Sequence, residues 1–393
     1  MVTPRTKTRN GTSGKAAPLL VTCLAGTVVV TCGRSPGPHQ QMARESAAPG
    51  PAVRQGASAR PRERPRPRPG KRPAPPPVVT VTEAAQILFP GARRRVASKT
   101  VTSWAGKAAL RACRDGKRPA RIRCLVARRY ERDARAARLA RAVYDLTGTV
   151  VGLEPARRMD GGWRGKLRLV PALLVGRHRR HLKRIAVALR DIDSFFKGLA
   201  KHAKRGGAGR AGRGAAIRYR WTALAFKAFR SVGRATPSAY AWGWTVAYNV
   251  NGSLLRHQRG VRQTLFHELF HLNDRHHKDW SDRVLQGLHR RIILRCTRGR
   301  GKRSRLSKGC LKPYAPHRTT VRGGVYYAFH PESGVGEYGA ELAVRYFLEQ
   351  RGVLSKSRRR PAPFKCRTPE NARAWRLIAA EFFGGVDLVP ACR

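Results

Sequence analysis

The sequence predicts an α+β domain in which a small mixed sheet precedes one motif-bearing helix and a mainly helical C-terminal half. The run Lys166–Val170 alternates in polarity as a half-buried strand does. Two further runs, Ala216–Trp221 and Tyr240–Asn249, are aromatic, β-branched and partly alternating, which also predicts strands. The apolar run Val261–Arg275 then has helical spacing, and helix signals return from Gly336 onward.

The chain begins with the features of an export signal. Basic residues precede an apolar stretch, Ala16–Val30, which is too short for a comfortable transmembrane span and is followed by a polar segment. Cys32 closes this stretch in the run Val-Val-Thr-Cys-Gly, which resembles a bacterial lipoprotein box with Thr31 where a smaller residue is usual. We therefore predict an exported protein, either lipid-anchored in the cell envelope through Cys32 or secreted, and an uncleaved anchor also stays open.

Composition divides the chain into four segments, the first being this leader, residues 1–32. Residues 33–77 are rich in Pro, Arg, Ala and Gly and lack the apolar groups for a core, so we predict a disordered basic linker. Residues 78–145 are predicted to be a helical N-terminal region that is a prodomain, a separate module or a layer of the next domain. Residues 146–393 are predicted to form the α+β domain.

Two helices of this domain are predicted from local signals. Apolar residues recur at intervals of three and four from Leu182 to Leu199, which is typical of an amphipathic helix packed on a large surface. A flexible loop, Gly206–Gly214, follows it. Near the C-terminus, Thr368 is a predicted N-cap with proline at the first helical position, and Gly384 is predicted to end that helix.

The charge of the chain is strongly positive. Its 82 Lys and Arg residues outnumber its 22 Asp and Glu residues, which gives a formal net charge of +60. Such a surplus favours anionic partners such as nucleic acid, acidic lipid or polysaccharide, and acidic substrates. The basic residues are spread over every segment, so we favour the alternative that a compositional bias coats the whole surface with arginines.

Six cysteines remain after the leader, and they fall into three locally spaced pairs. An even count suits disulfides in an oxidising compartment, whereas six reduced, buried thiols are the alternative. None has the CxxC spacing of a second metal site. The simplest connectivity is Cys113 with Cys124, Cys296 with Cys310, and Cys366 with Cys392.

One stretch carries recognisable chemistry, Thr264–Leu272, in which two histidines lie four positions apart. On a helix, His267 and His271 share one face and can bind one Zn²⁺, while Glu268 reaches a water on the metal. Zinc lowers the pKa of such a water and polarises a carbonyl, and the carboxylate transfers the proton. This HExxH pattern therefore predicts a catalytic zinc site with Glu268 as general base.

A catalytic zinc site normally has a third protein ligand, and two candidates exist. His277 has the spacing of the pattern HExxHxxGxxH, but Asp274 replaces its glycine, and every methionine lies upstream of the motif, so the methionine turn of that branch is missing. Glu337 is the better candidate. It lies one helical turn from Glu341, so that one carboxylate can bind the metal and the other accept a hydrogen bond from a liganding imidazole.

The run Gly336-Glu-Tyr-Gly-Ala-Glu341 resembles the second motif of the glutamate zincins, and among them the catalytic domain of anthrax lethal factor-like peptidases. The resemblance implies a zincin-like metallopeptidase domain with His267, His271 and Glu337 as zinc ligands and Glu341 behind them. It covers two short motifs and the order of elements. From that order we expect Thr245–Val250 to edge the cleft and to pair with an extended substrate.

One position departs from that family. Its transition-state-stabilising tyrosine precedes the glutamate ligand by seven residues, and His330 stands there in this chain. Tyr326, Tyr327 or His330 itself is therefore the candidate donor to an oxyanion.

The leading prediction is an exported zinc metallopeptidase acting on protein or peptide substrates. The alternative is a basic protein that binds polyanions or nucleic acid through an inactive zincin-like domain. A third reading, a DNA-associated protease resembling the SprT-like proteins, conflicts with the leader and the paired cysteines, so nucleic acid is not the expected partner.

Overall fold

The computed structural model describes residue 88 and residues 112–113, 118–160, 166–205, 216–299, 305–321, 324–331, 334–356 and 362–392. All of them belong to the unit Pro73–Arg393. The predicted leader with Cys32, the predicted linker and the loop Gly206–Gly214 lie outside the described residues. Within the described part, no helix combines the length and the apolar composition that a bilayer span requires.

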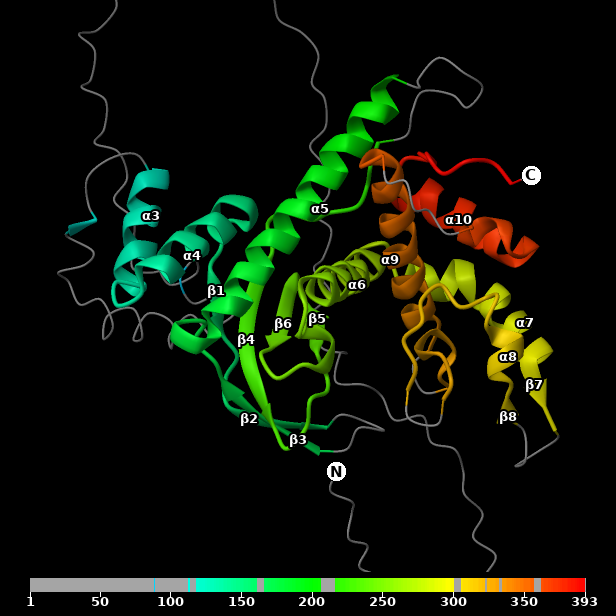
Figure 1. Ribbon diagram of the computed structural model, residues 1–393, viewed down its shortest axis with the longest axis horizontal. Helices are drawn as coiled ribbons and strands as arrows, with labels where there is room; N and C mark the ends of the chain where they lie inside the picture. The colour runs from blue at the N-terminus through cyan, green and yellow to red at the C-terminus, as the bar shows by residue number, and fades with distance from the viewer. Residues whose placement is uncertain are drawn as a thin grey trace, which may run out of the picture. The chain divides into compact units, whose positions relative to one another are not determined.

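A mixed six-stranded sheet lies at the centre of the unit (Figure 1). Its main order is β2-β3-β4-β6-β5, and β1 pairs with β4 beside β3. β4 runs parallel to β1 and β6 and antiparallel to β3, while β5 runs antiparallel to β6. The strands are β1 (Val151–Leu153), β2 (Arg157–Asp160), β3 (Lys166–Pro171), β4 (Ala225–Val232), β5 (Ala239–Trp242) and β6 (Thr245–Asn249). The predicted α+β class and the strand at Lys166–Val170 are therefore confirmed.

The run Tyr240–Asn249 forms two strands instead of one. β5 and β6 make a hairpin whose turn residues, Gly243 and Trp244, both have positive φ, 48° and 57°. This places β6 between β4 and β5, so the expectation that Thr245–Val250 edges the cleft is wrong. β5 is the edge strand, because the hairpin places it on the side of β6 that faces away from β4.

The run Ala216–Trp221 was expected to be a strand and is irregular. Its backbone is satisfied elsewhere, since the amides of Arg218 and Tyr219 donate to the carbonyl of Phe382 and the amide of Arg220 donates to Asn273 Oδ1. The Tyr219 ring stacks in the core instead of lying on a sheet face. Tertiary hydrogen bonds have overridden the aromatic strand propensity here.

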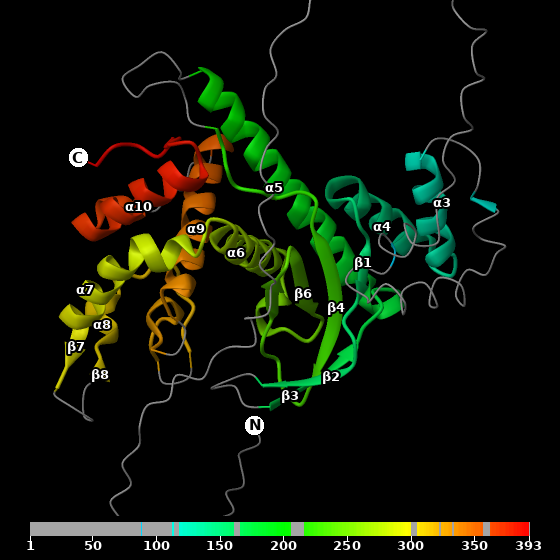
Figure 2. The same ribbon diagram turned by 180° about the vertical axis from the view of Figure 1, so that it is seen from behind.

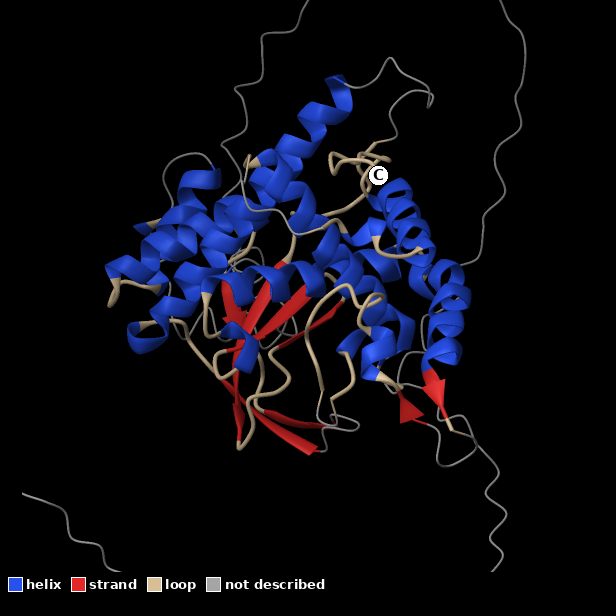
Figure 3. Ribbon diagram, turned by 45° about the vertical axis from the view of Figure 1, so that its right-hand side comes forward, coloured by secondary structure: helices blue, strands red, loops and turns tan. Residues whose placement is uncertain are grey.

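The two faces of the sheet contact different groups of residues. Figure 3 shows the helices gathered on one side of the strands. On that side Phe226 and Val246 belong to the large core that the helices share. On the other side Phe229, three positions after Phe226, and Ala247, one position after Val246, form a small cluster with residues of β3. The alternation follows from the two-residue period of a strand.

The long helix α5 (Arg179–Arg205) and the motif helix α6 (Gln258–His276) cover the core side of the sheet (Figures 1 and 2). The predicted apolar stripe of α5 is buried at all six expected positions: Leu182, Ile185, Leu189, Ile192, Phe196 and Leu199. On α6, Leu265, Phe266, Leu269 and Phe270 are fully buried. Both helix predictions are confirmed, and burial of these stripes is what holds the motif helix against the sheet.

Two further helices, α3 (Arg118–Arg129) and α4 (Ala134–Thr147), precede the sheet and contribute to the same core as α5. The disulfide between Cys113 and Cys124 joins the segment before α3 to the helix itself. The pairing is as predicted, and Cys124 lies within α3.

The chain after α6 is mainly helical, as predicted. A π-helical turn, η4 (Ser281–Leu285), leads into α7 (Gln286–Cys296), and the short pair β7 (Thr297–Arg298) and β8 (Arg305–Leu306) leads into α8 (Lys308–Leu311). The Cys296–Cys310 disulfide ties α7 to α8. The 3₁₀ turn η6 (Tyr327–Phe329) then precedes α9 (Gly334–Leu354).

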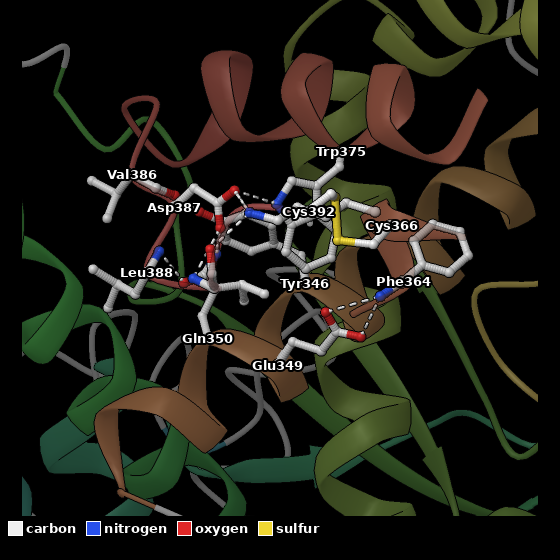
Figure 4. A network of polar contacts seen from close by, with 12 residues as sticks. Tyr346, Glu349, Gln350, Phe364, Cys366, Trp375, Val386, Asp387, Leu388 and Cys392 are labelled. Carbon is white, nitrogen blue, oxygen red and sulfur yellow. Dashed lines mark hydrogen bonds and ion pairs between the residues drawn. A yellow bond between two sulfur atoms is a disulfide. The ribbon is translucent and has the colours of Figure 1, made fainter. Parts of the chain in front are cut away.

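The helix α10 (Pro369–Phe382) begins as predicted, because Thr368 caps it by accepting a hydrogen bond from the Asn371 amide at 3.1 Å. The segment after it is held against α9 (Figure 4). Gln350 of α9 bonds to both Asp387 and the Leu388 amide, and the Asp387 carboxylate also accepts from the Trp375 indole at 3.0 Å. The disulfide Cys366–Cys392 closes this arrangement, as predicted.

Candidate metal centre

Helix α6 presents two imidazoles to one side. His267 and His271 lie one turn apart, their ring centroids are 4.8 Å apart, and their Nε2 atoms are 3.1 Å apart. The neighbouring Phe266 and Phe270 are buried in the core and fix how the helix is rotated about its axis. The helical spacing read from the sequence therefore brings both histidine nitrogens to one point.

Helix α9 supplies a carboxylate to the same point. Glu337 Oε2 lies 2.9 Å from His267 Nε2 and 3.5 Å from His271 Nε2. Glu337 lies in the first turn of α9, where the positive end of the helix dipole favours a carboxylate. Among the described residues, these three form the one cluster of His, Cys, Asp or Glu whose ligand atoms all lie within 4.8 Å of one another.

The close approach of α9 to α6 depends on a glycine. A Cβ atom at Gly339 would lie 2.4 Å from Ser281 Oγ and 2.9 Å from Phe270 Cε1, both well inside normal contact distance. Since Gly339 is two residues after Glu337, this contact sets how near the carboxylate comes to the imidazoles. Gly339, which offers no ligand atom, thus positions the candidate ligand Glu337.

The donor set fits a zinc ion. Two imidazoles and a carboxylate are the protein ligands of many catalytic zinc sites, and a tetrahedral ion bound at ~2.0–2.1 Å requires ligand atoms about 3.4 Å apart. The three separations here, 2.9, 3.1 and 3.5 Å, bracket that value. Little side-chain movement is needed for all three atoms to bind one ion.

The electrostatics of the cluster also suit a cation. Burial alone raises the pKa of Glu337, but the charge of His271 and the hydrogen bonds from His267 and His271 hold it well below its usual value. Burial lowers the pKa of His267, but the hydrogen bond to Glu337 and the charges of Glu337, Glu268 and Glu341 outweigh this and raise it to about 9. Negative charge is therefore concentrated where a metal would bind.

A cleft of about 810 Å³ opens beside these ligands. The edge strand β5 forms one wall through Ala239, Tyr240 and Ala241, and Thr319 and Val321 contribute from the segment before η6. His267, Glu268, His271, Glu337, Glu341 and Tyr327 all line it. Glu268 is largely buried, with 7% of its surface exposed, next to the point where the three ligands meet.

Compared with protein-family models, curated proteins and solved structures, the chain matches none. The geometry of the cleft is therefore what any assignment of function depends on.

The three candidate oxyanion donors are placed differently. Tyr327 lines the cleft, and its ring faces that of His267 at 6.2 Å with an interplanar angle of 29°. Tyr326 pairs with Thr320 in a β-bridge and is mostly buried, and His330 follows η6 outside the described lining of the cleft. Of these three side chains, only Tyr327 is in a position to reach a substrate bound in the cleft.

The competing third ligand, His277, is directed away from the cluster. Its Nδ1 lies 2.5 Å from Glu381 Oε1, and its ring packs against Phe382 at the end of α10. It follows the last residue of α6, beyond the face that carries His267 and His271. The geometry therefore gives His277 a structural contact with α10.

Sequence reasoning missed His317. Its Nδ1 lies 3.3 Å from Glu341 Oε2, and the other oxygen of Glu341 lies 3.9 Å from His267 Nδ1. Burial lowers the pKa of His317 to about 4 and raises that of Glu341 to about 7. Glu341 therefore stands between a ligand imidazole and a second imidazole in the cleft wall.

The segment around His317 also contacts Tyr327. The Thr319 hydroxyl lies 2.7 Å from His317 Nδ1, and the Thr319 carbonyl accepts from the Tyr327 amide at 2.9 Å. A lone histidine in an irregular segment has no spacing or periodicity that would have marked it. Its role is visible only because the fold brings this segment back to α6 and α9.

Proposed function

We propose that this chain is a zinc-dependent metalloendopeptidase of the glutamate-zincin type. The observation that carries the proposal is the meeting of His267, His271 and Glu337 at zinc-ligand spacing, beside Glu268 and an open cleft. Two of these residues come from a helix that was predicted from its HExxH pattern. The third, Glu337, comes from another helix and lies 66 positions after His271.

In this proposal zinc, when bound, supplies a Lewis acid that makes a water nucleophilic near neutral pH and polarises the scissile carbonyl. Glu268 takes the proton of the attacking water and returns it to the leaving amine, for which its position beside the ligands in a largely buried site is suited. Tyr327 donates to the oxygen on which negative charge develops.

The other residues of the cleft hold the substrate and the ligands. Among the strands of the described part of the chain, β5 pairs only with β6, so its outer edge has backbone groups that can pair with an extended peptide. Glu341 Oε1 lies 3.9 Å from His267 Nδ1, where its charge favours the ring orientation that directs Nε2 at the ligand site, and His317 Nδ1 lies 3.3 Å from the other Glu341 oxygen.

The proposed setting is outside the cytoplasm. Three disulfides at the predicted pairs support an oxidising compartment. Export by the leader, with lipidation of Cys32 as one outcome, belongs to the same proposal.

Elemental analysis of the purified chain tests the metal site directly. We expect one zinc per chain, retained in His277→Ala and lost or much weakened in Glu337→Gln. Dependence on His277 would overturn the ligand assignment. A chain that holds no zinc would contradict the proposal.

Activity is tested on the same preparations with an unfolded protein substrate. Glu268→Gln should keep its zinc and lose hydrolysis by a factor of at least about 10². Equal activity of this variant and the parent chain would remove Glu268 from the mechanism, even with zinc bound.

A further inference from the structure

A second recess lies between the beginnings of α4 and α5. Its volume is about 530 Å³, and six of its eight lining residues are cations: Arg135, Arg138, Arg177, Arg179, Arg180 and Lys183. It shares no lining residue with the cleft. The proposed peptidase function does not use it.

One carboxylate joins the two helix ends at this place. Asp133 caps α4 by accepting from the Ala136 amide at 3.0 Å, and it also accepts from the Gly176 amide at 3.0 Å. Arg179 Nη1 lies 2.9 and 3.0 Å from its two oxygens. The Ala136 hydrogen bond, assisted by Gly176 and Arg179, lowers the pKa of Asp133, so this carboxylate is ionised at neutral pH.

Asp133 offsets one of the six positive charges, and the other five have no carboxylate partner among the described residues. Arg135 and Arg138 lie one turn apart on α4, and Arg180 and Lys183 lie one turn apart on α5. Two cationic helix faces thus border the same recess. The positive ends of both helix dipoles point to the same region and add to the potential.

A general arginine bias accounts for cations on an exposed face, but it does not account for their grouping around a concavity. Like charges repel one another, and a concave surface with low-dielectric walls strengthens their combined field. An anion that enters the recess contacts several guanidinium groups at once and removes this repulsion. Guanidinium groups bind phosphate oxygens in pairs, with directed hydrogen bonds.

We propose that this recess binds a compact anion that carries two or more phosphate groups. Its volume lies in the range of small-ligand sites, and five uncompensated cations match the charge of such a ligand. Arg135 and Arg138 hold the ligand from α4, and Arg180 and Lys183 hold it from α5. Because the site is separate from the cleft, the proposal stands or falls independently of the peptidase function.

The test is calorimetric titration of the full chain with inorganic tripolyphosphate. We expect binding that weakens about tenfold or more in Arg135→Gln/Arg138→Gln and again in Arg180→Gln/Lys183→Gln, since each variant removes two charge-assisted contacts. The control is Arg373→Gln/Arg376→Gln, which removes two exposed arginines with the same spacing from α10. The control should change the affinity less than about twofold.

The comparison with the control decides between a site and diffuse charge. Equal losses in all three variants would show that tripolyphosphate binds to the general positive surface, and this would overturn the proposal. Phosphatidylglycerol vesicles form the second arm of the experiment. Vesicle binding that depends on the recess, together with tripolyphosphate binding that does not, would assign the recess to a membrane surface and also overturn it.

Discussion

The packing of α9 on α6 leads to a sharp prediction about Gly339. In Gly339→Ala the new Cβ meets Ser281 Oγ at 2.4 Å and the Phe270 ring at 2.9 and 3.1 Å. The serine hydroxyl can rotate away, but Phe270 is fully buried and has no room to move. The two helices must therefore separate, and Glu337 moves with α9.

The magnitude follows from two opposing contributions. Alanine is favoured over glycine inside a helix by about 1 kcal/mol, whereas overpacking a tight core contact costs about 1–3 kcal/mol. Gly352 lies on the same helix, and a Cβ there meets nothing within 4 Å. Gly352→Ala therefore gains helix propensity without overpacking the core. We expect the two variants to differ in free energy of unfolding by about 1–3 kcal/mol.

Zinc binding separates the effect on the site from the effect on stability. Metal–ligand distances tolerate deviations of only about 0.2 Å, so retreat of Glu337 should weaken zinc binding about tenfold or more in Gly339→Ala. Urea unfolding is measured for both variants in chelator and in excess zinc. The zinc-dependent gain in stability should be smaller by about 1.4 kcal/mol or more in Gly339→Ala alone. If both variants show equal stability and equal zinc-dependent gain, the contact at Gly339 does not position Glu337.

Three further outcomes are expected. His317→Ala should weaken zinc binding about tenfold to a hundredfold because it supports the carboxylate behind a ligand, whereas His330→Ala, outside the cleft lining, should not change it. Asp279→Asn/Asp282→Asn should reduce the preference in kcat/KM for a lysine-containing peptide over its norleucine analogue about threefold to tenfold, and an unchanged ratio would exclude these residues as specificity determinants. Burial lowers the pKa of His181 to about 4. Between about pH 6.5 and pH 4 the unfolded chain therefore binds a proton on this imidazole that the folded chain does not bind. Stability present above about pH 6.5 is therefore lost as the pH falls, and urea unfolding at pH 7 and pH 5 should show a loss about 2 kcal/mol larger in the parent chain than in His181→Gln.

The elements that sequence reasoning predicted correctly are those whose signals are local. The stripe of α5, the motif helix α6 and the capped start of α10 each depend on residues within a few turns of one another. The three disulfides were also predicted because each pair is close in the sequence. Glu337 was found through its one-turn spacing from Glu341, again a local signal, and the structure brings it to the two histidines.

The elements that were missed depend on distant partners. β4 contains Lys227 and Arg230, which obscure its strand pattern. Lys227 is buried in the fold because Glu154, also buried, lies 3.5 Å away, and because the Trp242 ring lies 4.9 Å from its ammonium group. No local pattern reveals that a lysine will find both partners. The same reason applies to Ala216–Trp221, whose hydrogen bonds go to α6 and α10.

The distribution of carboxylates connects the charge of the chain to its proposed function. Six of the 22 acidic residues line one cleft, together with a single arginine, Arg275: they are Glu268, Asp274, Asp279, Asp282, Glu337 and Glu341. Most other described carboxylates are paired with Arg, Lys or His, whereas the side chains of Asp279 and Asp282 make no ion pair among the described residues.

Asp279 and Asp282 are exposed at the cleft, so both carboxylates are hydrated and available to pair with a cationic side chain of a bound peptide. Salt screens charges beyond about 8 Å, so the basic surface outside the cleft has little effect on a substrate residue that is already in contact with Asp279 and Asp282. A peptide with a lysine or arginine near the scissile bond is therefore the substrate that this cleft would favour, although the protein as a whole repels it at long range.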